Sequence, residues 1–91
     1  MLYVICYDIS STKRRNKIFK TLKNYGEHKQ FSVFECDISQ RQLKKLVCTM
    51  EEIMKDEEEW SIRIYSLCEK CREKISALGE NQETEDVIIL G

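Results

Sequence analysis

Apolar and polar positions change their spacing several times along this chain, and each spacing predicts one element. Residues 2–7 form an almost unbroken apolar run that ends at Asp8, which is typical of a buried strand. A helix is expected next, with Ser11 or Thr12 as its cap and Gly26 as its C-terminal stop. Its apolar face carries, at helical spacing, Ile18, Phe19, Leu22 and Tyr25.

The middle of the chain predicts two short strands or one broken strand. Between residues 27 and 37 the alternation of apolar side chains changes phase near Val33 and Phe34. A single flat strand does not permit that change, because every side chain beyond it would move to the other face. We therefore expect either two strands joined by a tight bend or one strand interrupted by a bulge.

A second helix and a last strand follow. Ser39 and Gln42 have the spacing of a capping box. The acidic residues 56–59 predict a solvated loop, and residues 60–67 alternate as a half-buried strand. We expect Trp60, Tyr65 and the methionines in the core. The apolar stripe that predicts the second helix consists of Leu43, Leu46, Val47, Met50, Ile53 and Met54.

This order predicts the α+β class, as a ferredoxin-like βαββαβ domain with an antiparallel sheet and two helices on one face. Residues 1–91 form a single domain, and a core this small favours a homodimer. Residues 73–78 predict a helical turn or a strand, and the uncharged apolar residues 87–90 predict a strand that pairs. We expect residues 72–91 to add to a sheet, plausibly across the dimer.

Composition indicates the cellular compartment and the state of the cysteines. No apolar run approaches the roughly 20 residues that span a bilayer, and no signal peptide is recognisable, so we expect a cytoplasmic protein. The five cysteines are an odd number, which favours reduced and mostly buried thiols. Cys68 and Cys71 have the spacing of a zinc knuckle or a redox pair, but structural zinc needs four ligands. A reduced pair is the first expectation, and zinc shared by two pairs of a dimer is the alternative.

Charge is segregated along the chain although the net charge is −1. Residues 1–45 hold ten of the 15 Lys and Arg but only four of the 16 Asp and Glu. Such a cluster can be an ordinary solvated helix face, yet repulsion between unpaired like charges favours phosphate contact. We predict nucleic-acid contacts at Lys13, Arg14, Arg15, Lys17 and Lys20. Lys23 is a further cation on the same helix.

Asp8 is the candidate catalytic and metal-binding residue. An acid at the end of a buried strand, close to a basic segment, could place Mg²⁺ or Mn²⁺ against a phosphodiester. The alternative is an aspartate that stabilises its turn by accepting from backbone amides. Since one carboxylate is a poor magnesium site, we expect two Asp8 residues, one from each protomer, to share the ion with a substrate phosphate. His28 is the only histidine and is expected to be an ordinary strand-end residue.

Several short motifs, in this order and spacing, are similar to those of one family. Tyr7-Asp8 ends the first strand, Lys13-Arg14-Arg15 opens the helix, and Tyr25-Gly26 follows it. With residues 30–36 (Gln-Phe-Ser-Val-Phe-Glu-Cys), 62–65 (Ile-Arg-Ile-Tyr) and 67–68 (Leu-Cys), the chain resembles the CRISPR-associated protein Cas-two, the smaller of the two universal spacer-acquisition proteins. The resemblance covers nearly the whole chain.

The resemblance implies a ferredoxin-like homodimer in which a C-terminal strand crosses to the partner's sheet. It further implies a divalent-metal site at Asp8, metal-dependent endonuclease activity on RNA or DNA, and a complex with the CRISPR integrase that holds incoming DNA (the protospacer duplex). Ser11 and Thr12 stand where acids are common, His28 lies near a position that is often basic, and Phe31 replaces a frequent tyrosine. A non-catalytic DNA-binding scaffold and a toxin-like ribonuclease on the same fold are the alternatives.

Overall fold

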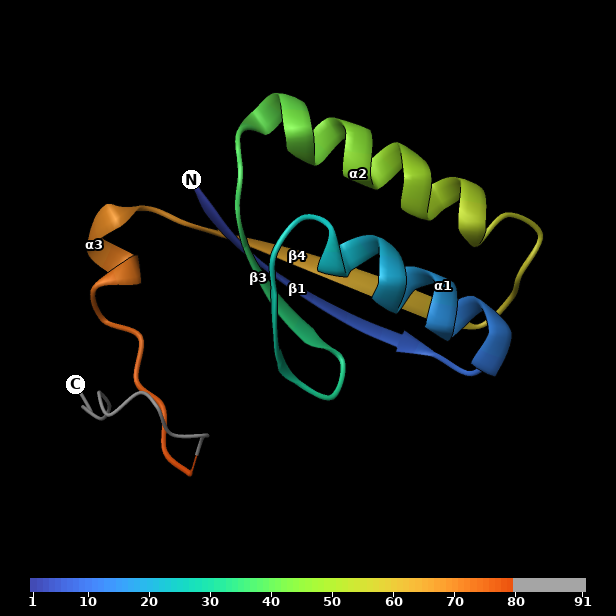
Figure 1. The fold of residues 1–91 in the computed structure, drawn as a ribbon, viewed down its shortest axis with the longest axis horizontal. Coiled ribbons are helices and arrows are strands. Elements are labelled where there is room, and N and C mark those ends of the chain that lie inside the picture. The colour runs from blue at the N-terminus through green and yellow to red at the C-terminus, as the bar shows by residue number, and fades with distance from the viewer. Residues whose placement is uncertain (80–91) are drawn as a thin grey trace.

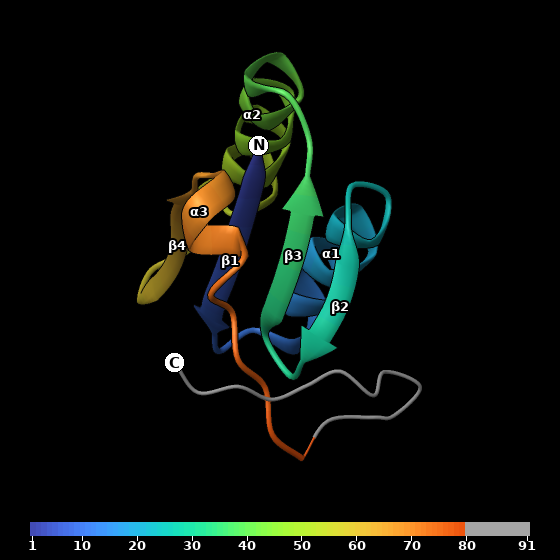
Figure 2. The ribbon, with the colours of Figure 1, turned by 90° about the vertical axis from the view of Figure 1, so that its left-hand side faces the viewer.

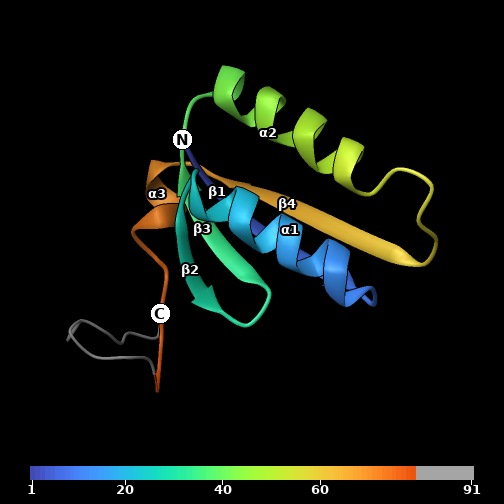
Figure 3. The ribbon, with the colours of Figure 1, turned by 45° about the vertical axis from the view of Figure 1, so that its right-hand side comes forward.

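Four antiparallel strands form one sheet, and two helices lie side by side over one of its faces (Figure 1, Figure 3). The computed structural model describes residues 1–79. The sheet order is β2-β3-β1-β4, so β1 is central and β2 and β4 are the edges. The predicted α+β order is confirmed. The elements are β1 (Leu2–Ile9), α1 (Thr12–Lys23), β2 (Glu27–Gln30), β3 (Val33–Asp37), α2 (Gln40–Ile53), β4 (Trp60–Leu67) and α3 (Glu69–Arg72).

The core lies between the sheet and the two long helices. Alternate side chains of β1 point into it, because successive residues of a strand face opposite sides of the sheet. Asp8 therefore lies on the face that α1 and α2 leave uncovered, between the buried Tyr7 and Ile9. The fully or nearly fully buried side chains include Tyr3, Ile5, Tyr7, Ile9, Ile18, Leu22, Phe34, Cys36, Leu46, Met50 and Met54.

The phase change in the middle of the chain is a hairpin (Figure 2). β2 and β3 pair antiparallel across a turn at residues 31–32, and their register shifts between His28 and Gln30. The prediction of two short strands joined by a tight bend is confirmed. The turn allows Phe34 and Cys36 to enter the core while Val33 and Glu35 lie on the other phase of β3.

Both long helices begin as the sequence predicts. The Ser11 side chain accepts a hydrogen bond from the Arg14 amide at 3.2 Å. Ser39 and Gln42 form a complete capping box, with bonds of 2.9 and 3.1 Å in the two directions. These bonds satisfy amides that have no partner within the helix.

The expected role of Gly26 as a helix stop is wrong. α1 ends at Lys23, and its C-cap is Asn24 in a right-handed conformation. Gly26 instead allows a close approach of two chain segments. A Cβ atom there would lie 2.3 Å from the backbone oxygen of Glu35 and 2.6 Å from the Cys36 sulfur.

The chain after β4 differs from the prediction. A four-residue helix, α3, follows directly, where the sequence pattern predicted no helix. Residues 73–74 form a turn, and residues 75–79 are in neither helix nor strand, so the predicted strand is absent from this segment. The apolar residues 87–90, and most of the segment expected to cross the dimer, lie outside the described residues. Among residues 1–79 no helix is long and apolar enough to cross a membrane.

Several side chains lie in a different environment from the one expected. Tyr65 is exposed, because it falls on the phase of β4 that points away from the helices. Of the five cysteines, all free, only Cys36 is buried. Burial, and to a lesser degree the nearby Glu35, raise its pKa to about 11. The prediction of mostly buried thiols is therefore wrong. Cys48 on α2, Cys71 on α3 and Cys68, which directly precedes α3, are exposed.

Candidate nucleic-acid and metal site

Asp8 lies near the end of β1, on the uncovered face of the sheet. Its position is fixed by pairing with β4, where Ser61 is its direct partner. The carboxylate is exposed and forms no hydrogen bond or ion pair with any residue of the described range. The alternative of an aspartate that stabilises its own turn is therefore not supported. Asp8 is free to bind a group from outside the chain.

Sequence reasoning missed two neighbours of Asp8 on the same face. Ser61 lies opposite it, and Arg63 lies opposite Cys6, one alternation away. The Arg63 guanidinium is exposed and donates a 3.1 Å hydrogen bond to the Tyr65 hydroxyl. The alternation of residues 60–67 marks both as polar, but only strand pairing places them beside Asp8. Ser61 is thus the direct strand partner of Asp8, and Arg63 is the cation of the same face, with its guanidinium bound to Tyr65 on the side away from Ser61.

One chain does not supply a complete metal site. No group of three or more His, Cys, Asp or Glu side chains gathers anywhere in residues 1–79. Mg²⁺ is commonly bound through one or two carboxylates, with substrate phosphates and water as the remaining ligands. Asp8 fits that pattern as one such carboxylate, and its uncovered face leaves room for a second copy to contribute another.

The six cations of α1 separate into two groups, which the sequence did not distinguish. Arg14 is half-buried and points toward the end of α2. Its Nη1 donates to the carbonyl oxygens of Ile53 at 2.7 Å and Lys55 at 2.9 Å, and its Nε lies 3.5 Å from a Glu57 oxygen. These bonds hold the C-terminal end of α2 against α1.

Arg15 is also bound within the chain. Its Nη1 donates to the carbonyl of Ile9 at 2.9 Å, and its Nη2 donates to the Thr12 hydroxyl at 3.3 Å. It therefore fixes the turn that leads from β1 into α1. Neither arginine therefore presents a free guanidinium to solvent. Burial raises the pKa of the Tyr7 hydroxyl, and the positive charge of Arg15 partly offsets that rise.

The lysines of α1 are the exposed cations. Lys13, Lys17 and Lys20 lie three or four positions apart and form no hydrogen bond or ion pair to the described residues. Positions at this spacing share one face of a helix. The Lys23 ammonium lies 5.6 Å from the centre of the Phe19 ring. These four residues, which we call the lysine face, are the positions at which the predicted phosphate contact is sterically open.

His28 is part of the hairpin, as expected, and not of the Asp8 site. Its Nε2 is 2.8 Å from the carbonyl oxygen of Phe31. Its ring centre lies 4.9 Å from that of Phe19 and 5.0 Å from that of Phe34. The ring is thus held against the core from the side of α1 and β3, and offers no free base to Asp8.

Cys68 and Cys71 lie together at the start of α3. Hydrogen bonds from the Cys71 amide and thiol, and from the Lys70 amide, lower the pKa of the Cys68 thiol. The same bond between the two side chains raises the pKa of Cys71. The two sulfurs form a pair, and no histidine or acid joins them to complete a metal cluster within the described chain.

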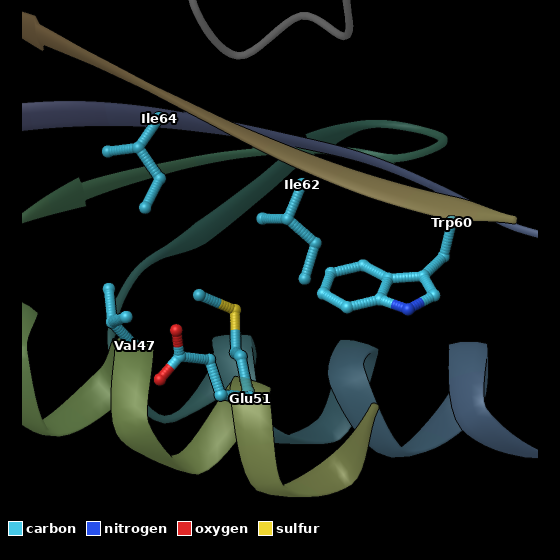
Figure 4. Close-up of a pocket in the computed structure, with 6 residues that line it drawn as sticks. Val47, Glu51, Trp60, Ile62 and Ile64 are labelled. Atoms are coloured by element: carbon cyan, nitrogen blue, oxygen red, sulfur yellow. The ribbon is translucent and has the colours of Figure 1, made fainter. Parts of the chain in front are cut away.

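A small pocket lies between α2 and β4 (Figure 4). Its β4 residues alternate with Ser61, the strand partner of Asp8, so it lies on the opposite side of the sheet from Asp8. Its volume is about 140 Å³. Glu51 is the only charged residue in its lining, and no nucleophile accompanies it. The pocket is therefore separate from the Asp8 site. The residues that line it are Val47, Met50, Glu51, Trp60, Ile62 and Ile64.

Known proteins share both the sequence and the fold. Residues 1–75 match the family model described as CRISPR associated protein Cas2. The CRISPR-associated endoribonuclease Cas2 1 of Chloroflexus aurantiacus is 41% identical over 93 residues, covering 99% of this chain and 100% of that protein. Streptococcus pyogenes Cas2 has a TM-score of 0.77 at 28% identity, over 87% of this chain and 100% of the other.

A further solved structure places this fold in an assembly. One chain of a partial Cas6-RT-Cas1–Cas2 complex has a TM-score of 0.76 and 29% identity, and 98% of each chain is covered. The family match spans most of this chain, and the relative from Chloroflexus matches it over its full length. The resemblance inferred from the motifs is thereby confirmed, and the chain belongs to the CRISPR-associated Cas2 family.

Proposed function

We propose that the protein acts in CRISPR adaptation as a homodimer that binds nucleic acid and hydrolyses phosphodiesters at Asp8. The observation that carries this proposal is the Asp8 carboxylate, which is exposed, has no partner among the described residues, and is fixed by a central strand. The names of relatives support it, since the protein from Chloroflexus aurantiacus is called an endoribonuclease.

Two observations support a dimer, namely the single carboxylate at the metal site and the exposed edge of the sheet. Asp8 lies on a face that the long helices do not cover, so a two-fold related copy could bring its own Asp8 nearby. β4 is an edge strand of eight residues, and such edges tend to pair with another strand. We infer that residues 72–91 supply the additional strand, crossing to the partner's sheet.

When bound between two Asp8 carboxylates, Mg²⁺ or Mn²⁺ would polarise the phosphate and lower the pKa of a bound water. The residues of the chain would position the cation and the phosphate. Asp8 would hold the cation's charge against the scissile phosphate, while Arg63 and Ser61 lie where they could contact the phosphate oxygens. No general base is present near Asp8 in residues 1–79, so we expect slow hydrolysis that accelerates as the pH rises.

The lysine face would hold the remainder of the nucleic acid. Lys13 lies in the first turn of α1, which follows directly on the Asp8 end of β1, and Lys17 and Lys20 continue along the helix. Because α1 covers the face of the sheet opposite to Asp8, the lysine face would hold a stretch of nucleic acid that passes around the sheet from the Asp8 site. Such contacts bind phosphates without reading the base sequence. We therefore infer salt-sensitive binding to DNA, including a protospacer duplex, and to RNA.

A non-catalytic scaffold is the second candidate. The single carboxylate and the absence of a nearby base in the described chain favour it, because neither is required to hold DNA. The solved Cas6-RT-Cas1–Cas2 complex supports an integrase of the Cas1 family as the partner. A toxin-like ribonuclease on the same fold would be distinguished by growth arrest on expression and by no affinity for the integrase.

The test compares wild type with Asp8→Asn in magnesium-dependent cleavage and in spacer acquisition. Asp37→Asn is the control, since Asp37 is another exposed carboxylate of the same sheet, paired with the opposite end of β1 at Leu2, where Arg72 and the N-terminal amine bind it. We expect Asp8→Asn, and a chelator, to abolish cleavage and Asp37→Asn to retain it. Persistent acquisition in Asp8→Asn would assign the biological role to the scaffold. Cleavage that survives both Asp8→Asn and the chelator would exclude Asp8 as the catalytic residue.

A further inference from the structure

The tip of the β2–β3 hairpin carries an aromatic ring that contacts almost nothing in the described chain. Phe31 is 90% exposed, more than any other large apolar residue of residues 1–79. A single exposed apolar side chain is common and would mean little on its own. Phe31 is unusual because its backbone has a φ of 23°, which is a strained conformation for a residue with a Cβ atom.

A side chain of the hairpin binds the strained turn. The carbonyl oxygen of Phe31 is bound by His28 Nε2 at 2.8 Å. The His28 ring in turn lies against Phe19 of α1 and Phe34 of β3, both part of the packed interior. The turn is therefore anchored to the core through His28, while the Phe31 ring remains free. A glycine would adopt this backbone more easily, so the ring is retained at a cost in stability.

The hairpin tip lies beside the Asp8 end of β1. The register of β1 and β3 ends with Cys6 opposite Val33, and the Tyr7 amide then donates to the Ser32 carbonyl at 3.1 Å. One step further along the same register, Phe31 corresponds to Asp8. Figure 2 shows the turn of the hairpin and the end of β1 at the same end of the sheet. The backbone of this turn thus lies beside the end of β1 that carries Asp8, and Ser61 pairs with Asp8 on the β4 side.

We propose that Phe31 is a stacking platform for an unpaired base of the nucleic acid whose phosphate is bound at Asp8. This inference deepens the proposed function and rests on it, and it names single-stranded or frayed nucleic acid as the preferred substrate class. An exposed ring close to a phosphate site suits a nucleobase, because each base is joined to its own phosphate through a single sugar. Every base has a π-face, so stacking of this kind carries little sequence preference.

The test measures the affinity of Phe31 variants for two single strands of equal length in magnesium. One strand is an oligothymidylate, and the other is an abasic strand with the same phosphates. We expect Phe31→Leu to bind oligothymidylate about tenfold or more weakly than wild type, and Phe31→Trp to bind it as wild type does. Wild type and both variants should bind the abasic strand with equal affinity. Phe31→Gly should lose binding in the same way while its thermal stability is unchanged or higher, because glycine relieves the positive φ.

Two outcomes would overturn the platform. The first is equal affinity of wild type and Phe31→Leu for oligothymidylate, and the second is an equal loss on both strands, which would indicate a general disturbance of the site. The proposed function is tested separately by the abasic strand. If Asp8→Asn does not weaken magnesium-dependent binding of that strand, the phosphate site itself is excluded, whatever the Phe31 variants do.

Discussion

Arg14 and Ile53, which are 39 positions apart, are joined by a hydrogen bond of 2.7 Å from the guanidinium to the backbone carbonyl. The same Nη1 donates a second bond to the carbonyl of Lys55, just beyond α2, so Arg14 binds the carbonyl groups at the C-terminal end of this helix. Carbonyls at this end of a helix have no partner within it, and the helix dipole favours a positive charge there. The most conspicuous arginine of the basic segment is therefore a structural residue in this chain.

We expect Arg14→Ala to lower the free energy of unfolding by about 1–3 kcal/mol, since it removes charge-assisted hydrogen bonds that are partly shielded from water. Urea denaturation measures the loss. Lys17→Ala removes a cation from the same helix and should change stability by no more than about 0.5 kcal/mol. Equal stabilities of the two variants would show that the Arg14 bonds contribute nothing beyond charge.

The lysine face predicts the salt dependence of nucleic-acid binding. A triple variant with alanine at Lys13, Lys17 and Lys20 should bind duplex DNA more weakly and flatten the slope of log K against log salt by up to about 3, since each phosphate contact contributes about 0.9. Filter binding over a range of salt concentrations measures the slope. The control carries alanine at Arg41, Lys44 and Lys45, which removes the same charge from α2. An identical change in both variants would mean that binding follows net charge and not the lysine face.

Gly26 predicts a steric effect. Gly26→Ala places a Cβ atom 2.3 Å from the Glu35 carbonyl, and this oxygen belongs to β3 and cannot rotate away. We expect a loss of about 1–3 kcal/mol or more in the free energy of unfolding, as is typical of overpacking. Asn24→Ala, two positions earlier in an exposed and right-handed conformation, is the control and should be nearly neutral. A Gly26→Ala protein as stable as wild type would contradict the close approach of the two segments.

The two thiols of α3 should differ in their response to pH. Hydrogen bonds stabilise the Cys68 thiolate and lower its pKa, whereas the same interaction raises the pKa of Cys71. Since the thiolate is the nucleophile, iodoacetamide should modify Cys68 first as the pH rises, with a midpoint below that of Cys71. Mass spectrometry of the modified protein follows each site.

Cys71→Ala is the matched control for this measurement. It removes the thiol that donates to Cys68, so the Cys68 midpoint should move upward toward the ordinary value. A Cys68 midpoint that does not respond to the Cys71 substitution would show that the two sulfurs act independently in solution.

The sequence by itself determined the order of elements, because burial and helix capping depend on local spacing. The capping box at Ser39, the phase change near Val33 and the alternation of residues 60–67 each predict an element that the structure confirms. The motifs also identified the family, because their order and spacing are read from the sequence without knowledge of the tertiary contacts.

The tertiary structure decided which side chains are available to other molecules. Arg14 and Lys17 look alike in sequence, but only strand and helix packing shows that Arg14 is bound to α2 while Lys17 is exposed. Likewise Phe31 and Arg63 approach Asp8 only through the pairing of β1 with β3 and β4. Spacing along a chain predicts which face of an element a residue occupies. Its partner on that face depends on contacts between segments that are distant in the sequence, because these contacts form only when the sheet is assembled.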